Sequence, residues 1–547
     1  MAGIGAYGSS TQNCRRQLEQ LFPEQLKAPE PFEADNIPVL KKVNGEWVSE
    51  TVKLSFFLPH DWFAKVAECD LIEAVFGTSL QKITEFWSSI DPNDPKLFEN
   101  PIKDVPDWQS LFIPFEYHGD AAPHQKHDSI HTNSCRSLLS TLSVDIAMLL
   151  ISATPGRCNS TKKRCDAFGI KWLGDTEAAI GKYIAWSMNA LFDGRHPEAD
   201  AHGNDFTDSY RKSVAGKYLD PVHNMRGTFW TIPADNEHTA LHYGLPHHAA
   251  ECKCMDCPAN TSDIPWDDLS PNAIWRKNIY STLEKALLRG NSHWLLSVKG
   301  IGPSHFGFDP MHCFEIGPAG TAVANVFFDL VYKKYTGLKS IKLQKLNKEV
   351  QECYKELGIT ENKISNLLEY KHFSDEKAPH QNFPDIMHSV IKARQVRYLV
   401  PVAAELCKKH HEPGDQYSNF RLKCLQSLAE SYQIVDRNRL FLGRDTRRYM
   451  KCIDLLVVHY AALRALSKNE GRYQWPIRPK LHYIAHIGIN ARWLSPRAFW
   501  CYPGESMVGA IASLAQSCLN NTAPHQVPTA LNSKYRFAKH LQFSIYL

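Results

Sequence analysis

The chain has 547 residues, of which 43% are hydrophobic, 11% aromatic and 22% charged. Single hydrophobic cores stop growing near about 250–300 residues, so this length predicts two or three folded units, or one core with a large insertion. The composition excludes a small disulfide-bonded module, a fibrous protein and a disordered chain. The formal net charge of +4 neither requires nor excludes an anionic partner.

The cysteines and the apolar segments bear on where the protein resides. Most of the fifteen cysteines stand alone among apolar neighbours, as Cys407, Cys424 and Cys452 do, which is typical of reduced thiols in a cytosolic or nuclear protein. The first twelve residues have no basic stretch leading into an apolar one, so they do not predict a secretory signal. No apolar run approaches the ~18–20 residues that span a bilayer. We therefore expect a nuclear or cytoplasmic protein that is not secreted and has no membrane partner.

The first part of the chain predicts an irregular lead-in followed by strands. Residues 1–50 carry scattered Pro and charge, and residues 54–98 suggest a short strand followed by a helix. The run 112–117 is rich in β-branched and aromatic residues and predicts a buried strand that ends at His118-Gly119-Asp120. Asp120 is thus expected at the mouth of this strand.

Further along, the pattern alternates between strand and helix. Residues 134–154 predict a second apolar strand or a pair of helices, and residues 175–191 have the spacing of an amphipathic helix. Residues 227–232 predict another strand, closed by Pro-Ala-Asp. A second acidic residue, Asp235, therefore follows a second strand.

The last half of the chain is predicted to be mainly helical. Residues 245–275 are irregular and rich in Cys, His and Asp, and a helical block follows over about 280–470. Small and apolar residues from Met507 onward predict a helix just after Glu505. We expect a first part of the core at 51–275, a helical insertion at 276–475 and a closing part of the core at 476–547.

The acids Asp120, Asp235 and Glu505 are candidate metal ligands. Two divalent cations held between such acids would activate a water or a 3′-hydroxyl and stabilise the leaving oxygen in phosphodiester chemistry. Acids also fall at element ends by chance among 58 such residues, as solvated loop residues or helix caps, and this structural interpretation stays open.

Four segments resemble CACTA-type (En/Spm-like) DNA transposases in their order and surroundings. They are YHGDAAPHQKHDSI (117–130), IPADNEHTALHYGLPHHAAECKCMDC (232–257), FDPMHCFEIG (308–317), and PKLHYIAHIG with SPRAFWCYPGESMVGAIASLAQSC (within 479–518). The resemblance implies an α/β fold with an RNase H-like mixed-sheet core. It also implies a large, mainly helical insertion between the second and third acidic residues.

The same resemblance implies a function and its residues. Asp120, Asp235 and Glu505 match the catalytic triad, which would bind Mg²⁺ or Mn²⁺, and Asp309 and His312 match an Asp-x-x-His element. DNA is the implied partner, both as element ends and as target, and a homo-oligomer is compatible with this activity.

Two departures from the family pattern keep an alternative open. The second acid lies in PADNEH instead of a DFPA-like string, and Gly504 precedes Glu505 where the pattern usually has Phe. The alternative is a catalytically inactive, domesticated transposase that acts as a nucleic-acid-binding or interaction module.

A cysteine cluster predicts half of a zinc site. Cys254-x-x-Cys257, with Cys252 two residues earlier, has the spacing of thiolate ligands, and His312 or Cys313 are candidates to complete the site. Reduced thiols packed in a loop are the alternative. A third interpretation is an unrelated metal-dependent hydrolase that uses an open three-ligand zinc site within residues 247–312.

Other motifs are less specific. The Asp-x-x-His spacing recurs at Asp385 and His388, where we expect Asp385 to cap a helix that starts at Ile386. Basic residues cluster in three places that would hold a polynucleotide or form solvated helix faces. They are Lys162, Lys163 and Arg164; Lys333, Lys334, Lys339, Lys342 and Lys345; and Arg437, Arg439, Arg444, Arg447, Arg448 and Lys451. No phosphate loop, dinucleotide fingerprint or Gly-x-Ser-x-Gly motif is present, which argues against an NTPase, a dehydrogenase and an ordinary hydrolase.

Overall fold

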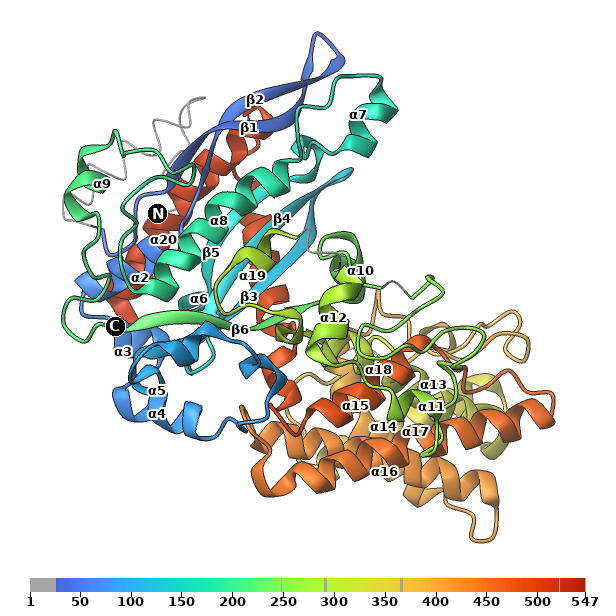
Figure 1. Cartoon of the computed structure of the whole chain (residues 1–547). Coiled ribbons are helices and arrows are strands. Elements are labelled where there is room, and N and C mark those ends of the chain that lie inside the picture. The colour runs from blue at the N-terminus through green and yellow to red at the C-terminus, as the bar shows by residue number, and fades with distance from the viewer. Residues whose placement is uncertain (1–25, 247, 290–292, 365–366, 521, 547) are drawn as a thin grey trace. The chain divides into compact units, whose positions relative to one another are not determined.

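The computed structural model describes residues 26–246, 248–289, 293–364, 367–520 and 522–546 (Figure 1). The chain divides into two compact units that interleave along the sequence. Unit 1 draws its described residues from Met1–Ala234, Ala286–Phe306 and Tyr502–Leu547, and unit 2 from Asp235–Lys285 and Gly307–Cys501. Helices together with a mixed sheet make this an α/β protein, as the sequence predicted.

A five-stranded mixed sheet has the order β5-β4-β3-β6-β7; its first four strands belong to unit 1, and β7 crosses the boundary between the units along the chain. The strands β3 and β4 pair antiparallel, as do β4 and β5, whereas β6 runs parallel to β3. The strands are β3 (Phe112–Gln125), β4 (Asp128–Ser137), β5 (Leu149–Pro155), β6 (Arg226–Ala234) and β7 (Phe306–Phe308). The sequence located β3 and β6 but placed the end of β3 too early.

The strand β3 continues through Asp120 to Gln125 instead of ending at His118-Gly119-Asp120. Gly, Asp, Ala and Pro in this stretch are typical of a turn, yet β4 pairs with the whole segment and places Thr132 opposite Asp120. The local composition does not favour a strand here, but β4 provides hydrogen-bond partners for the backbone N–H and C=O groups of this segment. Asp120 therefore lies within the strand and not at its mouth.

A hairpin occupies part of the predicted irregular lead-in. The strands β1 (Phe32–Val43) and β2 (Glu46–Phe56) pair antiparallel, so the prediction is wrong from Phe32 onward, and residues 1–25 lie outside the described residues. Asn44 and Gly45 connect the strands with φ angles of 50° and 88°. Positive φ at both positions is typical of the two-residue hairpin turn whose twist fits that of the flanking strands. The Asn-Gly pair in the sequence already indicated such a hairpin.

The helices of unit 1 surround the two sets of strands. Residues 175–191 were correctly predicted as a helix, which is α8 in the structure. The helices are α2 (Pro59–Glu68), α3 (Ile72–Phe76), α4 (Leu80–Ser88), α5 (Trp108–Leu111), α6 (Val144–Ala147), α7 (Lys162–Phe168), α8 (Thr176–Asp193), α9 (Ser209–Val214), α19 (Tyr502–Gln516) and α20 (Val527–Tyr546).

The helices α8 and α19 cover opposite faces of the sheet (Figure 1). A Cβ on Gly227 of β6 would lie 2.7 Å from the Phe115 ring and 2.8 Å from Leu191 of α8. A Cβ on Gly504 of α19 would overlap the ring of His118. Because side chains alternate along a strand, Phe115 and His118 of β3 point to opposite faces. Asp120, two residues beyond His118, points to the α19 face.

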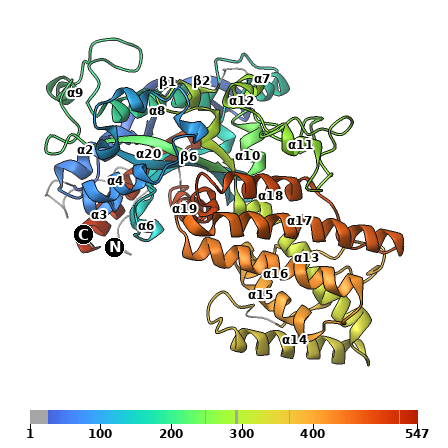
Figure 2. The same cartoon turned by 60° about the horizontal axis from the view of Figure 1, so that its bottom comes forward.

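Unit 2 is mainly helical. Figure 2 shows α16 and α17 lying side by side, with α15 packed against α16. The helices are α10 (Asn236–Leu241), α11 (Ile274–Lys277), α13 (Pro318–Asp329), α14 (Lys339–Glu356), α15 (Ala393–Lys409), α16 (Gln416–Arg437), α17 (Thr446–Asn469) and α18 (Pro479–Asn490), and α12 (Thr282–Arg289) crosses the boundary between the units along the chain. The helical block was predicted correctly, but no helix starts at Ile386, because α15 begins at Ala393. Among the described helices, none is long and apolar enough to cross a bilayer.

A buried polar cluster joins three helices of unit 1. Arg211 of α9 donates to both carboxylate oxygens of Asp61 at 2.7 and 2.5 Å, and His60 Nδ1 lies 2.7 Å from Ser187 Oγ of α8. His60, Asp61 and His196 have the donor types of a metal site. The Arg211 guanidinium already supplies the positive charge next to Asp61, so we interpret this cluster as structural.

This cluster predicts a loss of stability in mild acid. Burial lowers the pKa of His60 from 6.5 to about 3. Below pH 6.5 the unfolded chain binds a proton that the folded protein excludes, so the stabilisation is present above pH 6.5 and is lost as the pH falls. We expect His60 to cost unit 1 about 2 kcal/mol of unfolding free energy between pH 7 and pH 5. Urea unfolding of the parent and of His60→Asn, which does not titrate, measures this; equal pH dependence in the two proteins would contradict it.

Candidate metal centre

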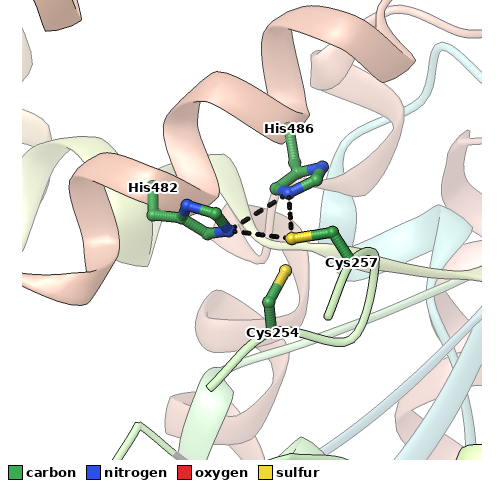
Figure 3. A group of neighbouring side chains, drawn as sticks. All are labelled: Cys254, Cys257, His482 and His486. Atoms are coloured by element: carbon green, nitrogen blue, oxygen red, sulfur yellow. Dashed lines mark hydrogen bonds between the residues drawn. The ribbon is translucent and has the colours of Figure 1, made fainter. Parts of the chain in front are cut away.

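Four side chains of unit 2 converge on one point. They are Cys254 and Cys257, from the loop that follows α10, and His482 and His486, from α18 (Figure 3). One ligand atom from each residue lies within 4.8 Å of all the others, and all four residues are buried.

Local structure explains why each pair faces one way. The two histidines are four residues apart on a helix, so they lie on one face, one turn above the other. Pro479 begins this helix at a position where its missing N–H costs nothing. The Cys-x-x-Cys segment turns so that the Asp256 N–H donates to Cys254 Sγ at 3.3 Å. Backbone and helix geometry thus aim all four ligand atoms inward.

The distances match tetrahedral coordination. Cys257 Sγ lies 3.3 Å from Nε2 of His482 and 3.3 Å from Nε2 of His486, and the two Nε2 atoms are 3.2 Å apart. Zn–N bonds of about 2.0–2.1 Å and Zn–S bonds of about 2.3 Å give N–N and N–S edges of roughly 3.3–3.6 Å in a tetrahedral site. Two thiolates and two imidazoles are a donor set that favours zinc. The cluster therefore fits one Zn²⁺ ion.

The surroundings hold the ligands in place. Asp256 accepts hydrogen bonds from Lys285 at 2.5 Å and from Asn490 at 2.8 Å, and its Oδ2 lies 3.8 Å from Nδ1 of His486. A carboxylate beside the second ring nitrogen orients a metal-binding histidine. The Trp275 ring lies 4.4 Å and 5.0 Å, centroid to centroid, from the rings of His482 and His486. This packing leaves the site closed, which is typical of structural and not of catalytic zinc.

Burial raises the pKa of the Cys254 thiol. The metal ligand is the thiolate, so zinc binding must displace a proton from a group that otherwise holds it firmly. Zinc affinity should therefore increase with pH.

The structure corrects two of the predicted zinc ligands. Cys252 is exposed and does not belong to the cluster, and His312 instead places its Nδ1 2.5 Å from Oδ2 of Asp309. Cys313, the other candidate, is buried but also lies outside the cluster. The ligands missed by sequence reasoning are His482 and His486, and the only signal for them was a His-x-x-x-His spacing within a predicted element. A closed four-ligand site also gives no support to the metal-dependent hydrolase.

The Asp-x-x-His element forms a separate hydrogen-bond network in unit 2, centred on Asp309. The buried Asp309 carboxylate accepts from the backbone N–H groups of Met311 at 3.0 Å, His312 at 2.9 Å and Cys501 at 2.8 Å. These bonds fix the segment that precedes α13 against the residues that precede α19 along the chain. Asp309 therefore has a structural role: its carboxylate binds the backbone of two chain segments and orients the His312 ring.

The three candidate catalytic acids are all half-exposed. Oδ1 of Asp120 accepts from the Ala121 N–H at 2.7 Å. Glu505 lies in the first turn of α19, next to Gly504, whose backbone contacts His118 on the face of β3 that Asp120 shares. The structure thus brings Asp120 and the start of the Glu505 helix to the same face of one strand.

Asp235 has a cap role in the structure. It directly follows β6 and is the first residue of unit 2, and its Oδ1 accepts from the His238 N–H at 2.5 Å at the start of α10. Glu116 of β3 and Thr231 of β6 are paired in the parallel ladder. Asp120 and Asp235 each come four residues after one of these two partners. Asp235 thus has the helix-cap role that the sequence left open as an alternative, and the cap hydrogen bond uses one of its two carboxylate oxygens.

Comparison with known proteins does not identify a family. No protein-family model matches the chain, and no curated protein matches it. The functional assignment rests on the residues and their geometry.

Proposed function

We propose that unit 1 is an RNase H-like nucleotidyl-transfer core that cuts and joins DNA strands, as CACTA-type transposases do. In this proposal Asp120 and Glu505 of unit 1, together with Asp235, which directly follows β6 along the chain, bind two Mg²⁺ or Mn²⁺ ions. The observation that carries it is the meeting of Asp120 and the Glu505 helix on one face of β3, although most of the chain separates them. The three carboxylates are not among the described groups whose ligand atoms lie within 4.8 Å of one another, but Asp120 and the start of α19 share one face of β3, which helix capping alone does not require.

The sheet topology supports the proposal. The first three strands of the sheet, β3 to β5, form an antiparallel meander, and the fourth, β6, returns parallel to the first. An RNase H-like core has this mixed arrangement. Unit 2 interrupts unit 1 along the chain between the second and third acids, where the transposase resemblance implies a helical insertion.

The residues would divide the chemistry as follows. Bound cations supply Lewis-acid activation of a water or 3′-hydroxyl and stabilisation of the leaving oxygen. Asp120 lies in β3, where it pairs with Thr132 of β4, and Glu505 lies in the first turn of α19, so the backbone of both residues is fixed before substrate arrives. In the proposal the zinc centre of unit 2 is structural and fixes the Cys254–Cys257 loop to α18.

Metal-directed cleavage of the polypeptide tests the site without a known DNA sequence. Fe²⁺ in place of Mg²⁺, with ascorbate and peroxide, generates hydroxyl radicals that cut the backbone near the bound ion. We expect cuts in β3 near Asp120 and at the start of α19, suppressed by excess Mg²⁺. Cuts confined to other segments would contradict the proposed site, and so would an unchanged cleavage pattern in the Glu505→Gln variant.

The fit of α19 against β3 gives a separate prediction. Gly504 leaves the space that the His118 ring fills, which explains why the residue before Glu505 is not the Phe of the family pattern. We expect Gly504→Val to shift α19, to destabilise unit 1 by about 1–3 kcal/mol and to lower metal-dependent DNA cleavage. Thermal unfolding and a nicking assay measure the two effects.

Two further variants make this prediction specific. Adding His118→Ala to Gly504→Val removes the clash and should restore part of the stability. Gly509→Ala in the same helix is the matched control, because a Cβ there meets nothing within 4 Å. It should stabilise the protein slightly, by about 0.5–1 kcal/mol. If Gly509→Ala destabilised the protein as much as Gly504→Val does, the effect of Gly504→Val would not arise from its contact with His118.

A further inference from the structure

A basic pocket of about 970 Å³ lies in unit 1 where several chain turns meet. The β1–β2 hairpin and the turn between β3 and β4 contribute to its lining, together with the segment after β5, α7 and residues 523–525. Its cationic side chains are Lys41, Lys42, Lys126, Arg157 and Arg164. Residues from at least five separate segments converge there, so the charge is gathered by the fold and not by a local run of sequence.

The pocket has an excess of positive charge. Among the described lining residues Asp128 is the only one with a carboxylate; its Oδ2 forms an ion pair with Arg157 Nε at 3.1 Å, and its Oδ1 accepts from the Arg157 backbone N–H at 2.8 Å. Glu50, outside the lining, pairs with Lys41 at 2.5 Å. Lys42 and Lys126 are exposed to solvent. Positive charge lining a concave surface attracts anions more strongly than the same charge spread over a convex one.

Aromatic packing positions two of the cations. The ammonium of Lys42 lies 5.2 Å from the centroid of the Trp47 ring, and the guanidinium of Arg164 lies 6.0 Å from it. Phe168 stacks on the same indole at 5.1 Å. Arg164 also donates to the carbonyls of Gly156 and Asn159 at 2.7 and 2.6 Å. The charges are thus pre-arranged, which reduces the entropy lost when an anion binds.

We propose that this pocket binds the phosphate backbone of DNA. The choice of DNA rests on the proposed function, because the β3–β4 hairpin that carries Asp120 also supplies the lining residues Gln125 and Lys126. Gln125 lies five positions beyond Asp120 in β3, a span of about 17 Å. At 3.4 Å per nucleotide of one strand, this is about five nucleotides of duplex. In the proposal the pocket holds the flank of the DNA, about half a helical turn from Asp120.

Charge reversal at the two exposed lysines tests this inference. We expect Lys42→Glu with Lys126→Glu to weaken binding of a fluorescein-labelled 30-base-pair duplex at least tenfold. The slope of log affinity against log salt should fall by about 2, because two phosphate contacts are lost. Fluorescence anisotropy over a series of salt concentrations gives both quantities. Unchanged affinity and slope would overturn the proposal.

The controls separate this inference from the proposed catalysis. Binding is measured in EDTA and in an Asp120→Asn background, so a protein without nuclease activity still reports on the pocket. Lys103→Glu with Lys212→Glu reverses two exposed lysines of unit 1 that lie outside the pocket, and it should change the affinity less than twofold. Poly-glutamate that displaces the duplex as well as unlabelled DNA does, at equal charge concentration, would assign the pocket to acidic polypeptides and overturn the proposal.

Discussion

Replacement of Asp120 by Asn will abolish metal-dependent DNA cleavage while the protein remains folded. Asn keeps the shape of the side chain and can still accept from the Ala121 N–H, so the hydrogen bond seen in the structure survives. What is lost is a negative charge on a cation, a contribution of several kcal/mol, so we expect a rate decrease on the order of 10³-fold or more. Nicking of supercoiled plasmid in Mg²⁺ or Mn²⁺ measures it, and circular dichroism confirms folding.

The other acids offer matched comparisons. Asp235→Asn retains a residue type that caps helices well, so it separates a metal role from the cap on α10. Glu505→Gln removes the third charge, and Glu237→Gln, an exposed acid near Asp235, is the control. Full cleavage activity in Asp120→Asn and Glu505→Gln would refute the catalytic proposal. If the parent protein binds DNA but never cuts it, the inactive binding module is the better description.

Loss of zinc will unfold unit 2. We expect the purified protein to contain one zinc per chain, and Cys257→Ala or His486→Ala to contain almost none. Structural zinc contributes about 10–16 kcal/mol of apparent binding free energy in small zinc domains, so its removal should exceed any single packing change. Atomic emission measures the metal, and the transition of unit 2 in thermal unfolding measures the stability.

The matched control for zinc is Cys252→Ala. Cys252 is two residues from Cys254 but is exposed and outside the cluster, so this variant should keep its zinc and its unfolding temperature. Cobalt substitution should give the absorption bands of a tetrahedral site in the parent and in Cys252→Ala. Zinc lost from Cys252→Ala, or retained in Cys257→Ala, would show that the four-residue assignment is wrong.

The sequence pointed to two of the four residues of this candidate metal centre, for a physical reason. Cys-x-x-Cys is a local motif, since both ligands come from one short loop. His482 and His486 lie far along the chain, and histidines four residues apart are common on helices without any metal. Only the folded chain shows that this helix faces the loop. The ligands predicted from proximity in sequence, Cys252 and His312, were therefore wrong.

Secondary structure showed a similar limit. The helix at 175–191 was predictable because its apolar spacing is self-contained. The extension of β3 past Asp120 was not, because its Gly, Ala and Pro residues favour a turn until β4 supplies a hydrogen-bonding partner. The β1–β2 hairpin was missed despite its Asn44-Gly45 turn, since charged residues along both strands obscure the alternation.

The interleaving of the two units has a consequence for synthesis of the chain. The helix α20 contacts β2 and β5: Tyr535 Oη donates to the Met148 carbonyl and accepts from the Leu150 N–H, and Asn532 donates to the Ser55 carbonyl at 2.9 Å. Unit 1 therefore cannot close until the residues of α20 have left the ribosome. A chain that stops between Asp235 and the start of α19 would carry the first two acids but lack Glu505.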